Sequence, residues 1–192
     1  AYCQKEGIIS GYADGTFKPA ATLTGYAFMK MLLGALGYDS SIEGYTGANW
    51  SIAVGKRALG IGLDDGNDNF VGVNAVTREE ACLYAFNTLK ATMVEYKDNS
   101  TVTVGDITIA NKSTATEVER TSGKDYTGYN ESSDQKDSCG TQQFCEKYFS
   151  DLKAEDDTDD FGAPATKWIY DSEDVGTYAN DVDDTYTVED SN

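Results

Sequence analysis

Residues 7–19 read Gly-Ile-Ile-Ser-Gly-Tyr-Ala-Asp-Gly-Thr-Phe-Lys-Pro, and this stretch decides how the first half of the chain is organised. Its glycines permit positive φ angles and close backbone approach, and Asp14 can accept hydrogen bonds from backbone amides of the turn. Phe17 can insert into a core and so fix the loop. The stretch therefore predicts a rigid turn that connects one helix to the next.

The same loop recurs in a second copy. Residues 11–15 (Gly-Tyr-Ala-Asp-Gly) match residues 62–66 (Gly-Leu-Asp-Asp-Gly) at an offset of 51 residues. Two further landmarks correspond at an offset of 53 residues: Phe17 with Phe70, and Thr24 with Thr77. The longer offset indicates an insertion at residues 67–69. Internal repetition of this kind indicates one supersecondary unit that buries its apolar face by stacking on its neighbours.

Two helices are predicted between the first loop and the second. One runs over about residues 24–36, with Thr22 or Thr24 as its N-cap and Gly37 as its stop. Another runs over about residues 48–59.

The next helix begins after Thr77 as N-cap, with Glu80 at the capping-box position. Its apolar residues recur at helical spacing and are Cys82, Leu83, Phe86, Leu89 and Met93. This spacing predicts a helix whose apolar side faces the core.

Residues 7–19 resemble the loop of the S-layer homology (SLH) repeat, which reads G-I-I-x-G-Y-x-D-G-T-F-x-P. In that family a T-R-A-E motif then opens a second helix. The second copy in this chain keeps the motif at residues 77–80 as Thr-Arg-Glu-Glu, whereas the first copy reads Thr-Gly-Tyr-Ala at residues 24–27. The long loop is the specific part of the resemblance, because a four-residue helix start is weak alone.

The resemblance covers about residues 1–96, as two repeats at about 1–37 and 48–96. It implies helix–loop–helix units in a partial pseudo-threefold bundle, because SLH modules usually carry three repeats. The opening residues read as the tail of a helix, so we expect a fragment of a longer protein. Whether a third repeat lies upstream of residue 1 stays open.

The resemblance also implies a ligand. SLH repeats bind secondary cell-wall polymers, often with pyruvylated sugars, and the arginine of T-R-A-E contacts the ligand. By position this role falls on Arg78, with Thr77 and Glu79 beside it. The first turn of a helix favours an anion, and a guanidinium can bind a carboxylate with two hydrogen bonds. The alternative is a local ion pair of Arg78 with a neighbouring carboxylate such as Glu80.

The first copy offers a weaker site. Gly25 stands where the family has arginine and has no side chain to contribute. Gly11 and Tyr12 have two equal interpretations: they either line a sugar pocket or belong to a turn that is only structural.

The charge balance excludes several functions. Lys and Arg number 15 against 33 Asp and Glu, which gives a net charge of −18, and the chain has no histidine. An acidic chain repels nucleic acid and anionic membranes, because phosphate binding depends on Lys and Arg. The lack of histidine removes the commonest general base, and no local constellation of residues points to catalysis. We therefore expect a protein that is not an enzyme and does not insert into a membrane.

The cysteines and acidic runs leave alternatives. Cys139 and Cys145 either close a small disulfide loop or do not, whereas Cys3 and Cys82 are expected to be free and buried in helices. Residues 64–69 and 156–160 are expected to be solvated acidic loops. Calcium coordination is the alternative for both, so we expect no cofactor, with calcium as the one exception to test.

Residues 97–180 are predicted to form a small β-rich extension, which makes the chain α+β. A hairpin is expected at residues 101–109 around Gly105-Asp106, with a type II′ turn. An irregular excursion follows at 111–140, then a short helix at 144–152. Strands are expected around 164–170 and 175–178, and residues 181–192 are predicted to be an acidic linker.

Taken with the resemblance, these features predict a non-catalytic surface module. It would anchor an exported bacterial protein to a Gram-positive-type cell wall by binding wall polysaccharide, outside the cell. The alternative is a structural subunit of an S-layer or surface filament, in which the repeats contact copies of the chain or neighbouring surface proteins.

Overall fold

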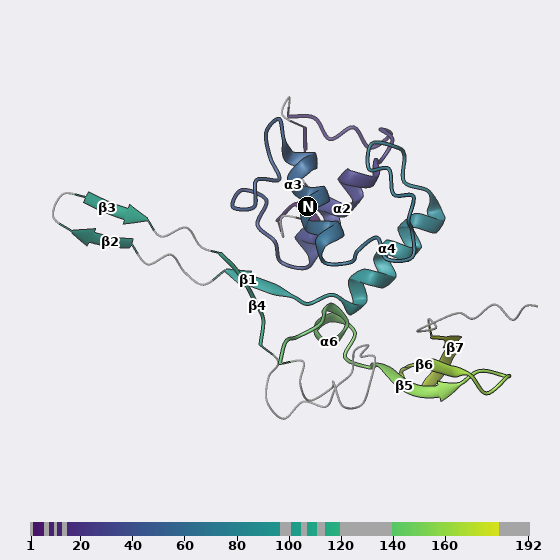
Figure 1. The fold of residues 1–192 in the computed structure, drawn as a ribbon. Coiled ribbons are helices and arrows are strands. Elements are labelled where there is room, and N and C mark those ends of the chain that lie inside the picture. Colours follow the sequence, from purple (N-terminus) through teal and green to yellow (C-terminus); the bar gives the residue numbers. More distant parts are fainter. Residues whose placement is uncertain are drawn as a thin grey trace, which may run out of the picture.

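The computed structural model describes residues 2–5, 8–9, 11–12, 15–96, 101–104, 107–110, 114–119 and 140–180 (Figure 1). The helices are α1 (Tyr2–Lys5), α2 (Gly25–Ala35), α3 (Trp50–Gly60), α4 (Arg78–Lys90) and α6 (Phe144–Tyr148). The strands are β1 (Val94–Tyr96), β2 (Thr101–Val104), β3 (Ile107–Ala110), β4 (Ala115–Glu117), β5 (Leu152–Thr158), β6 (Pro164–Tyr170) and β7 (Glu173–Ala179). Helices and antiparallel strands are thus both present, as an α+β chain requires. The pseudo-threefold arrangement of repeats stays a prediction.

Helix α2 begins and ends where local sequence signals predict. Thr24 is its N-cap, and the Thr24 Oγ1 accepts a hydrogen bond from the Ala27 amide at 3.3 Å. Gly37 follows the helix with a φ of 105°, a value that L side chains rarely adopt. Of the two threonines considered as N-cap, Thr24 is the one used.

Helix α4 carries the expected capping box. The Glu80 amide donates to Thr77 Oγ1 at 3.2 Å, and the Thr77 amide donates to Glu80 Oε2 at 2.8 Å. The helix ends at Lys90, short of Met93, because the chain becomes extended there: the Met93 amide donates to the Gln142 carbonyl at 2.8 Å.

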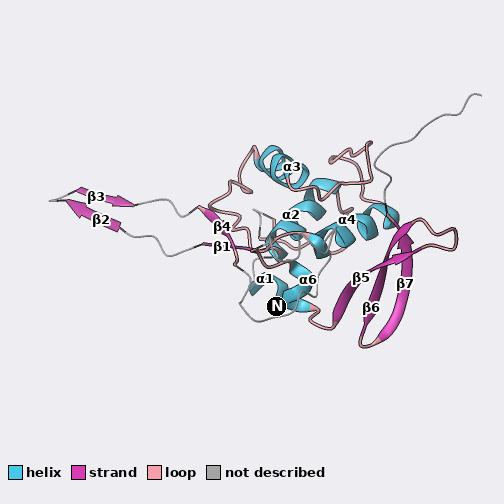
Figure 2. Ribbon diagram, turned by 60° about the horizontal axis from the view of Figure 1, so that its bottom comes forward, coloured by secondary structure: helices cyan, strands magenta, loops and turns pink. Residues whose placement is uncertain are grey.

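The helices α2, α3 and α4 surround one core, from which the β2–β3 hairpin extends away and beside which the β5–β7 sheet lies (Figures 1 and 2). Fully buried side chains come from all three helices and from the segments between them: Met29, Leu33, Leu36, Tyr45, Val54, Ala58, Leu63 and Tyr84.

Phe17 does not insert into this core, contrary to expectation. Its side chain is 58% exposed, because the segment after residue 15 runs along the outside of the helices. The equivalent Phe70 packs edge-on against two rings, with centroids 5.8 Å from both Tyr26 and Tyr84.

The expected buried side of α4 is only partly right: Leu83 packs against the core and Met93, beyond the helix end, is buried, whereas Cys82 and Phe86 are exposed. The buried residues of α4 are Tyr84, Asn87 and Thr88. Cys82 is exposed, because it lies two residues before Tyr84 and thus about 200° around the helix from it. Cys3 is exposed as well. Cys139 lies outside the described residues, so its pairing with Cys145 stays a prediction.

The second half is partly as expected. Strands β2 and β3 pair antiparallel, although Gly105 and Asp106 lie outside the described residues, so the turn type is untested. The predicted excursion contains β4, which pairs antiparallel with β1. The helix that begins at Phe144 ends at Tyr148 and does not reach residue 152, because Leu152 is already the first residue of β5.

Strands β5, β6 and β7 form an antiparallel sheet in that order. Residues 156–158 belong to β5, so the acidic run is half strand and not only a loop. The sheet contacts the helical part through Trp168, whose ring centroid lies 5.6 Å from that of Phe86 on α4. Residues 181–192 lie outside the described residues, and their role as a linker stays a prediction. Within the described part, none of the helices is both long and apolar enough to cross a membrane.

Candidate functional site

The two helix starts that correspond in the repeats lie side by side. Thr24 and Ala75 form an isolated antiparallel bridge, and the Val76 amide donates to the Leu23 carbonyl at 3.0 Å. The segment that leads into α4 therefore runs along the segment that leads into α2, and both N-caps are held at one place in the fold.

The start of α2 is closed by the second loop. The Gly25 amide donates to the Asn74 carbonyl at 3.0 Å, and the Tyr26 amide donates to the Gly72 carbonyl at 2.8 Å. These are the first two amides of the helix, which would otherwise be the donors for a bound anion. The carbonyls of the second loop thus occupy the position that an anionic ligand would take.

Gly25 is required for this closure. A Cβ at residue 25 would lie 3.0 Å from Phe70 Cε2 and 3.1 Å from Gly72 Cα, which is tighter than ordinary side-chain contact. The other face of the contact is also filled, because the Tyr26 ring lies against the backbone of Gly72 and of Gly55 on α3. An arginine in the family's position has no space here.

The start of α4 is accessible. Arg78 is the first residue of the helix and is exposed. Among the described residues its guanidinium has no hydrogen bond and no ion pair, so the predicted alternative, a pair with Glu79 or Glu80, is not formed. The Arg78 and Glu79 amides likewise have no acceptor in the described part of the chain.

Glu80 is held away from Arg78 by other partners. Its Oε2 accepts from the Thr77 amide, and its Oε1 lies 3.4 Å from Asn67 Nδ2 and 3.5 Å from the Tyr84 hydroxyl. These hydrogen bonds, chiefly those with Thr77, hold the pKa of the Glu80 carboxyl below its usual value. Glu80 therefore shapes the helix start, whereas Thr77 and Glu79 remain exposed beside Arg78.

Gly11 and Tyr12 form a tight turn at another place. The Tyr12 amide donates to the Thr16 carbonyl at 2.8 Å, and a Cβ at residue 11 would lie 2.9 Å from that same oxygen. The turn thus explains the glycine. The Tyr12 ring is 49% exposed and carries the Lys18 ammonium 4.5 Å from its centroid. Among the described residues, no hydrogen bond or ion pair joins Gly11 or Tyr12 to residues 77–79.

The acidic second loop is occupied by its own structure. Asn87 Nδ2 donates to the Leu63 and Asp65 carbonyls at 3.2 and 2.9 Å, and Asn67 Nδ2 donates to the Tyr84 hydroxyl at 2.6 Å. No group of three or more His, Cys, Asp or Glu side chains able to hold a metal ion occurs among the described residues. The calcium alternative for this loop gains no support.

Sequence reasoning missed a pocket on another side of α3. It has a volume of about 390 Å³ and is lined by Glu43, Tyr45, Ala53, Lys56, Arg57, Gly60 and Ile61. The one signal available was the Lys56-Arg57 pair, which stands out in a chain with 15 basic residues among 192. Their partners lie too far away in sequence to be recognised.

Comparison with known proteins gives one match. The family model described as S-layer homology domain matches residues 1–25. Neither a curated protein nor a solved structure matches the chain. The matched residues include the loop at 7–19, and the resemblance seen there is thereby confirmed. Residues 1–25 are thus similar to the S-layer homology domain, a kind of domain that in general anchors proteins to the cell wall, and the second copy lies outside the matched residues.

Proposed function

We propose that the chain is a non-catalytic module that retains an exported protein on the cell wall by binding secondary wall polysaccharide at the start of α4. One observation carries the proposal: Arg78 is exposed at the first helical position and has no ion-pair partner among the described residues. The guanidinium is therefore accessible to an anion, in a chain whose net charge is −18.

The chemistry of this helix start suits a carboxylate on a sugar, such as a pyruvyl group. The guanidinium can donate two parallel hydrogen bonds, and the amides of Arg78 and Glu79 face the same end of the helix. Glu79 lowers the positive potential beside Arg78, so the site favours one small anionic group over a polyanion.

Sedimentation with purified wall polysaccharide tests this site. Arg78→Ala should lower the affinity at least about tenfold, the equivalent of one lost charge-assisted interaction of about 1.4 kcal/mol. The far-UV circular dichroism should not change, since the exposed Arg78 side chain makes no hydrogen bond or ion pair within the described fold. Lys153→Ala is the matched control, because Lys153 is an exposed cation on β5. Undiminished sedimentation of Arg78→Ala contradicts the assignment.

A second candidate function is a structural subunit of an S-layer or filament. The closed start of α2 favours it, since one of the two corresponding sites cannot bind an anion. Exposed apolar side chains also lie beside that start, namely Leu23, Val71 and Val73, which are 38%, 50% and 71% exposed. Size-exclusion chromatography and negative-stain microscopy, with and without calcium, separate the two functions. Ordered assembly in the absence of glycan favours the subunit.

A further inference from the structure

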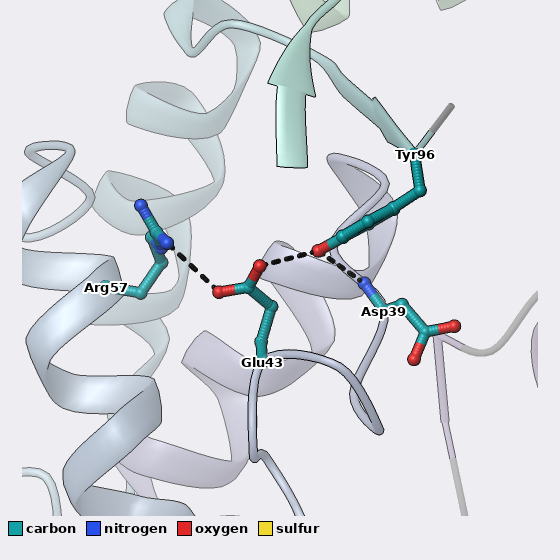
Figure 3. Close-up of polar contacts among 4 residues, drawn as sticks. All are labelled: Asp39, Glu43, Arg57 and Tyr96. Carbon is teal, nitrogen blue, oxygen red and sulfur yellow. Dashed lines mark hydrogen bonds and ion pairs between the residues drawn. The ribbon is translucent and has the colours of Figure 1, made fainter. Parts of the chain in front are cut away.

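Two residues that line the pocket on α3, Glu43 and Arg57, belong to a polar chain that joins three segments. Arg57 on α3 pairs with Glu43 in the connector between α2 and α3, with Nη2 and Oε2 3.0 Å apart. The Tyr96 hydroxyl on β1 donates to Glu43 Oε1 at 2.8 Å and accepts from the Asp39 amide at 3.2 Å (Figure 3). Both carboxylate oxygens of Glu43 are thus engaged, and the connector is fixed against α3 and β1.

Tyr45 has a hydroxyl that this chain of contacts leaves unsatisfied. Its side chain is 1% exposed, and its hydroxyl has no hydrogen-bond partner of normal geometry among the described residues. Burial chiefly, together with the Glu43 carboxylate, raises the pKa of Tyr45, and the nearby Arg57 guanidinium opposes this. Tyr45 is one of the residues that line the pocket, and a buried hydroxyl without a partner costs about 1–3 kcal/mol, a cost that a ligand reaching this hydroxyl would relieve.

The pocket also concentrates positive charge. Its lining holds Lys56, Arg57 and Glu43, which sum to one positive charge in a chain of net charge −18. Lys56 is exposed and has no ion-pair partner among the described residues. Its neighbours Ala53, Gly60 and Ile61 present an apolar wall. A ligand that fits must therefore offer a carboxylate to the cations, hydroxyls to the free lone pairs of Glu43, and a small apolar face.

We propose that this pocket binds an acidic sugar, a ligand with one carboxylate and several hydroxyls, held by Lys56, Arg57 and the Tyr45 hydroxyl. A volume of about 390 Å³ lies at the small end of the range of ligand sites and accommodates one or two sugar rings. The site uses no residue of the α4 start. It thus goes beyond the proposed function, and its test does not depend on Arg78.

Thermal unfolding of the full chain with sodium glucuronate as the probe tests the site. Sodium glucuronate should raise the melting temperature by about 5–10 °C at about 100 times its dissociation constant. Glucose, acetate and sodium chloride at matched ionic strength are the reference arms, because salt alone stabilises a strongly acidic chain by screening its self-repulsion. An equal shift with glucose or with chloride overturns the proposal.

Two variants locate the binding. Lys56→Gln should remove most of the glucuronate-induced shift, whereas Lys153→Gln, the same charge change on β5, should not. Gly60→Leu should block the pocket without harming the fold, because a Cβ at residue 60 meets no atom within 4 Å and leucine favours a helix more than glycine does. A full shift in Lys56→Gln or Gly60→Leu overturns the proposal.

Two further variants separate this site from its alternatives. Tyr45→Phe should unfold at the same or a higher temperature without ligand, because it deletes an unsatisfied hydroxyl, and should show a smaller shift with glucuronate. An undiminished shift in Tyr45→Phe overturns the role of its hydroxyl. Arg78→Ala should keep the whole shift. If Arg78→Ala loses the shift while Lys56→Gln keeps it, glucuronate binds at the α4 start and the pocket is not its site.

Discussion

Helices α2 and α4 begin with the same N-cap residue, in the same local geometry, at neighbouring places in the fold, and yet only α2 has its first two amides bonded to another segment of the chain. Thr24 and Thr77 each accept a hydrogen bond from the amide three residues on. At α2 the next two amides are taken by the carbonyls of Asn74 and Gly72, whereas at α4 the corresponding amides have no acceptor in the described part of the chain.

The difference lies in the residue after the cap and in what packs on it. Gly25 lets the backbone of residues 70–74 approach α2 within contact distance, whereas Arg78 is exposed and no described segment accepts a hydrogen bond from the first amides of α4. At the start of α2, an internal contact with residues 70–74 lies where the resemblance would place a ligand site. A helix start is an anion site only while no carbonyl of the same chain fills it.

The largest effect is expected when the contact between residues 70–74 and the start of α2 is removed. Gly72→Ala places a Cβ within the Tyr26 ring, which cannot move aside freely because Gly55 and Phe70 hold it. We expect a loss of about 3 kcal/mol in the free energy of unfolding, typical of an overpacked contact. Urea denaturation measures it. Gly60→Ala is the control and should gain about 0.5–1 kcal/mol, because its Cβ meets open space. Equal stability of Gly72→Ala and the wild type would show that the contact is loose.

The next test restores the family's arginine in the first copy. Gly25→Arg should cost about 2 kcal/mol of stability, since its Cβ presses on Phe70 and Gly72. It should not create a wall-binding site. Made together with Arg78→Ala, it should leave the affinity for wall polysaccharide as low as in Arg78→Ala alone. Rescue of binding in this double variant would mean that the start of α2 opens readily and that the closure is not what disables it.

The local features of both helix starts could be predicted, and the closure could not. Thr24, Thr77 and Glu80 act through bonds to amides within three residues, so their roles are visible in a short window of sequence. The absence of an arginine at residue 25 signalled a defective site, but the plug of residues 70–74 depends on tertiary packing.

The wrong predictions of burial also arise from tertiary packing. Phe17 and Phe70 correspond in the repeat, yet only Phe70 finds a place between two rings, because the path of the chain after each loop differs. On α4 the apolar spacing pointed to Cys82 and Phe86, whereas the core takes Tyr84, and Phe86 packs on Trp168 of the sheet. The polar chain of Glu43, Arg57 and Tyr96 joins positions too distant in sequence for any motif to reveal.

A smaller effect compares the caps themselves. Thr77→Ala should lower the free energy of unfolding by about 1 kcal/mol, and Thr24→Ala should cost less. The reason is that Gly25 and Tyr26 keep their bonds to the second loop when Thr24 loses its hydroxyl, whereas α4 has no such support from another segment. Chemical denaturation of both variants, with Thr22→Ala as a control outside the cap, measures the difference. A larger cost for Thr24→Ala than for Thr77→Ala would show that α2 depends on its N-cap more than α4 does.

The smallest expected effect is a pH dependence of stability that arises from the cap of α4 and not from that of α2. Helix α4 carries Glu80 three residues after its cap, where α2 has Ala27, so only α4 has a titrating group there. The folded pKa of Glu80 is depressed below its usual value of 4.5, chiefly by its hydrogen bonds with Thr77. A depressed carboxyl stabilises the fold above its unfolded pKa, and this contribution disappears as the pH falls through the folded pKa. Glu80→Gln, which preserves the hydrogen bonds of the capping box, should therefore be less stable than the wild type at pH 7 and nearly equal to it near pH 3. Thermal unfolding from pH 3 to pH 7 measures this, and a constant difference across that range would show that the charge of Glu80 adds nothing to the cap.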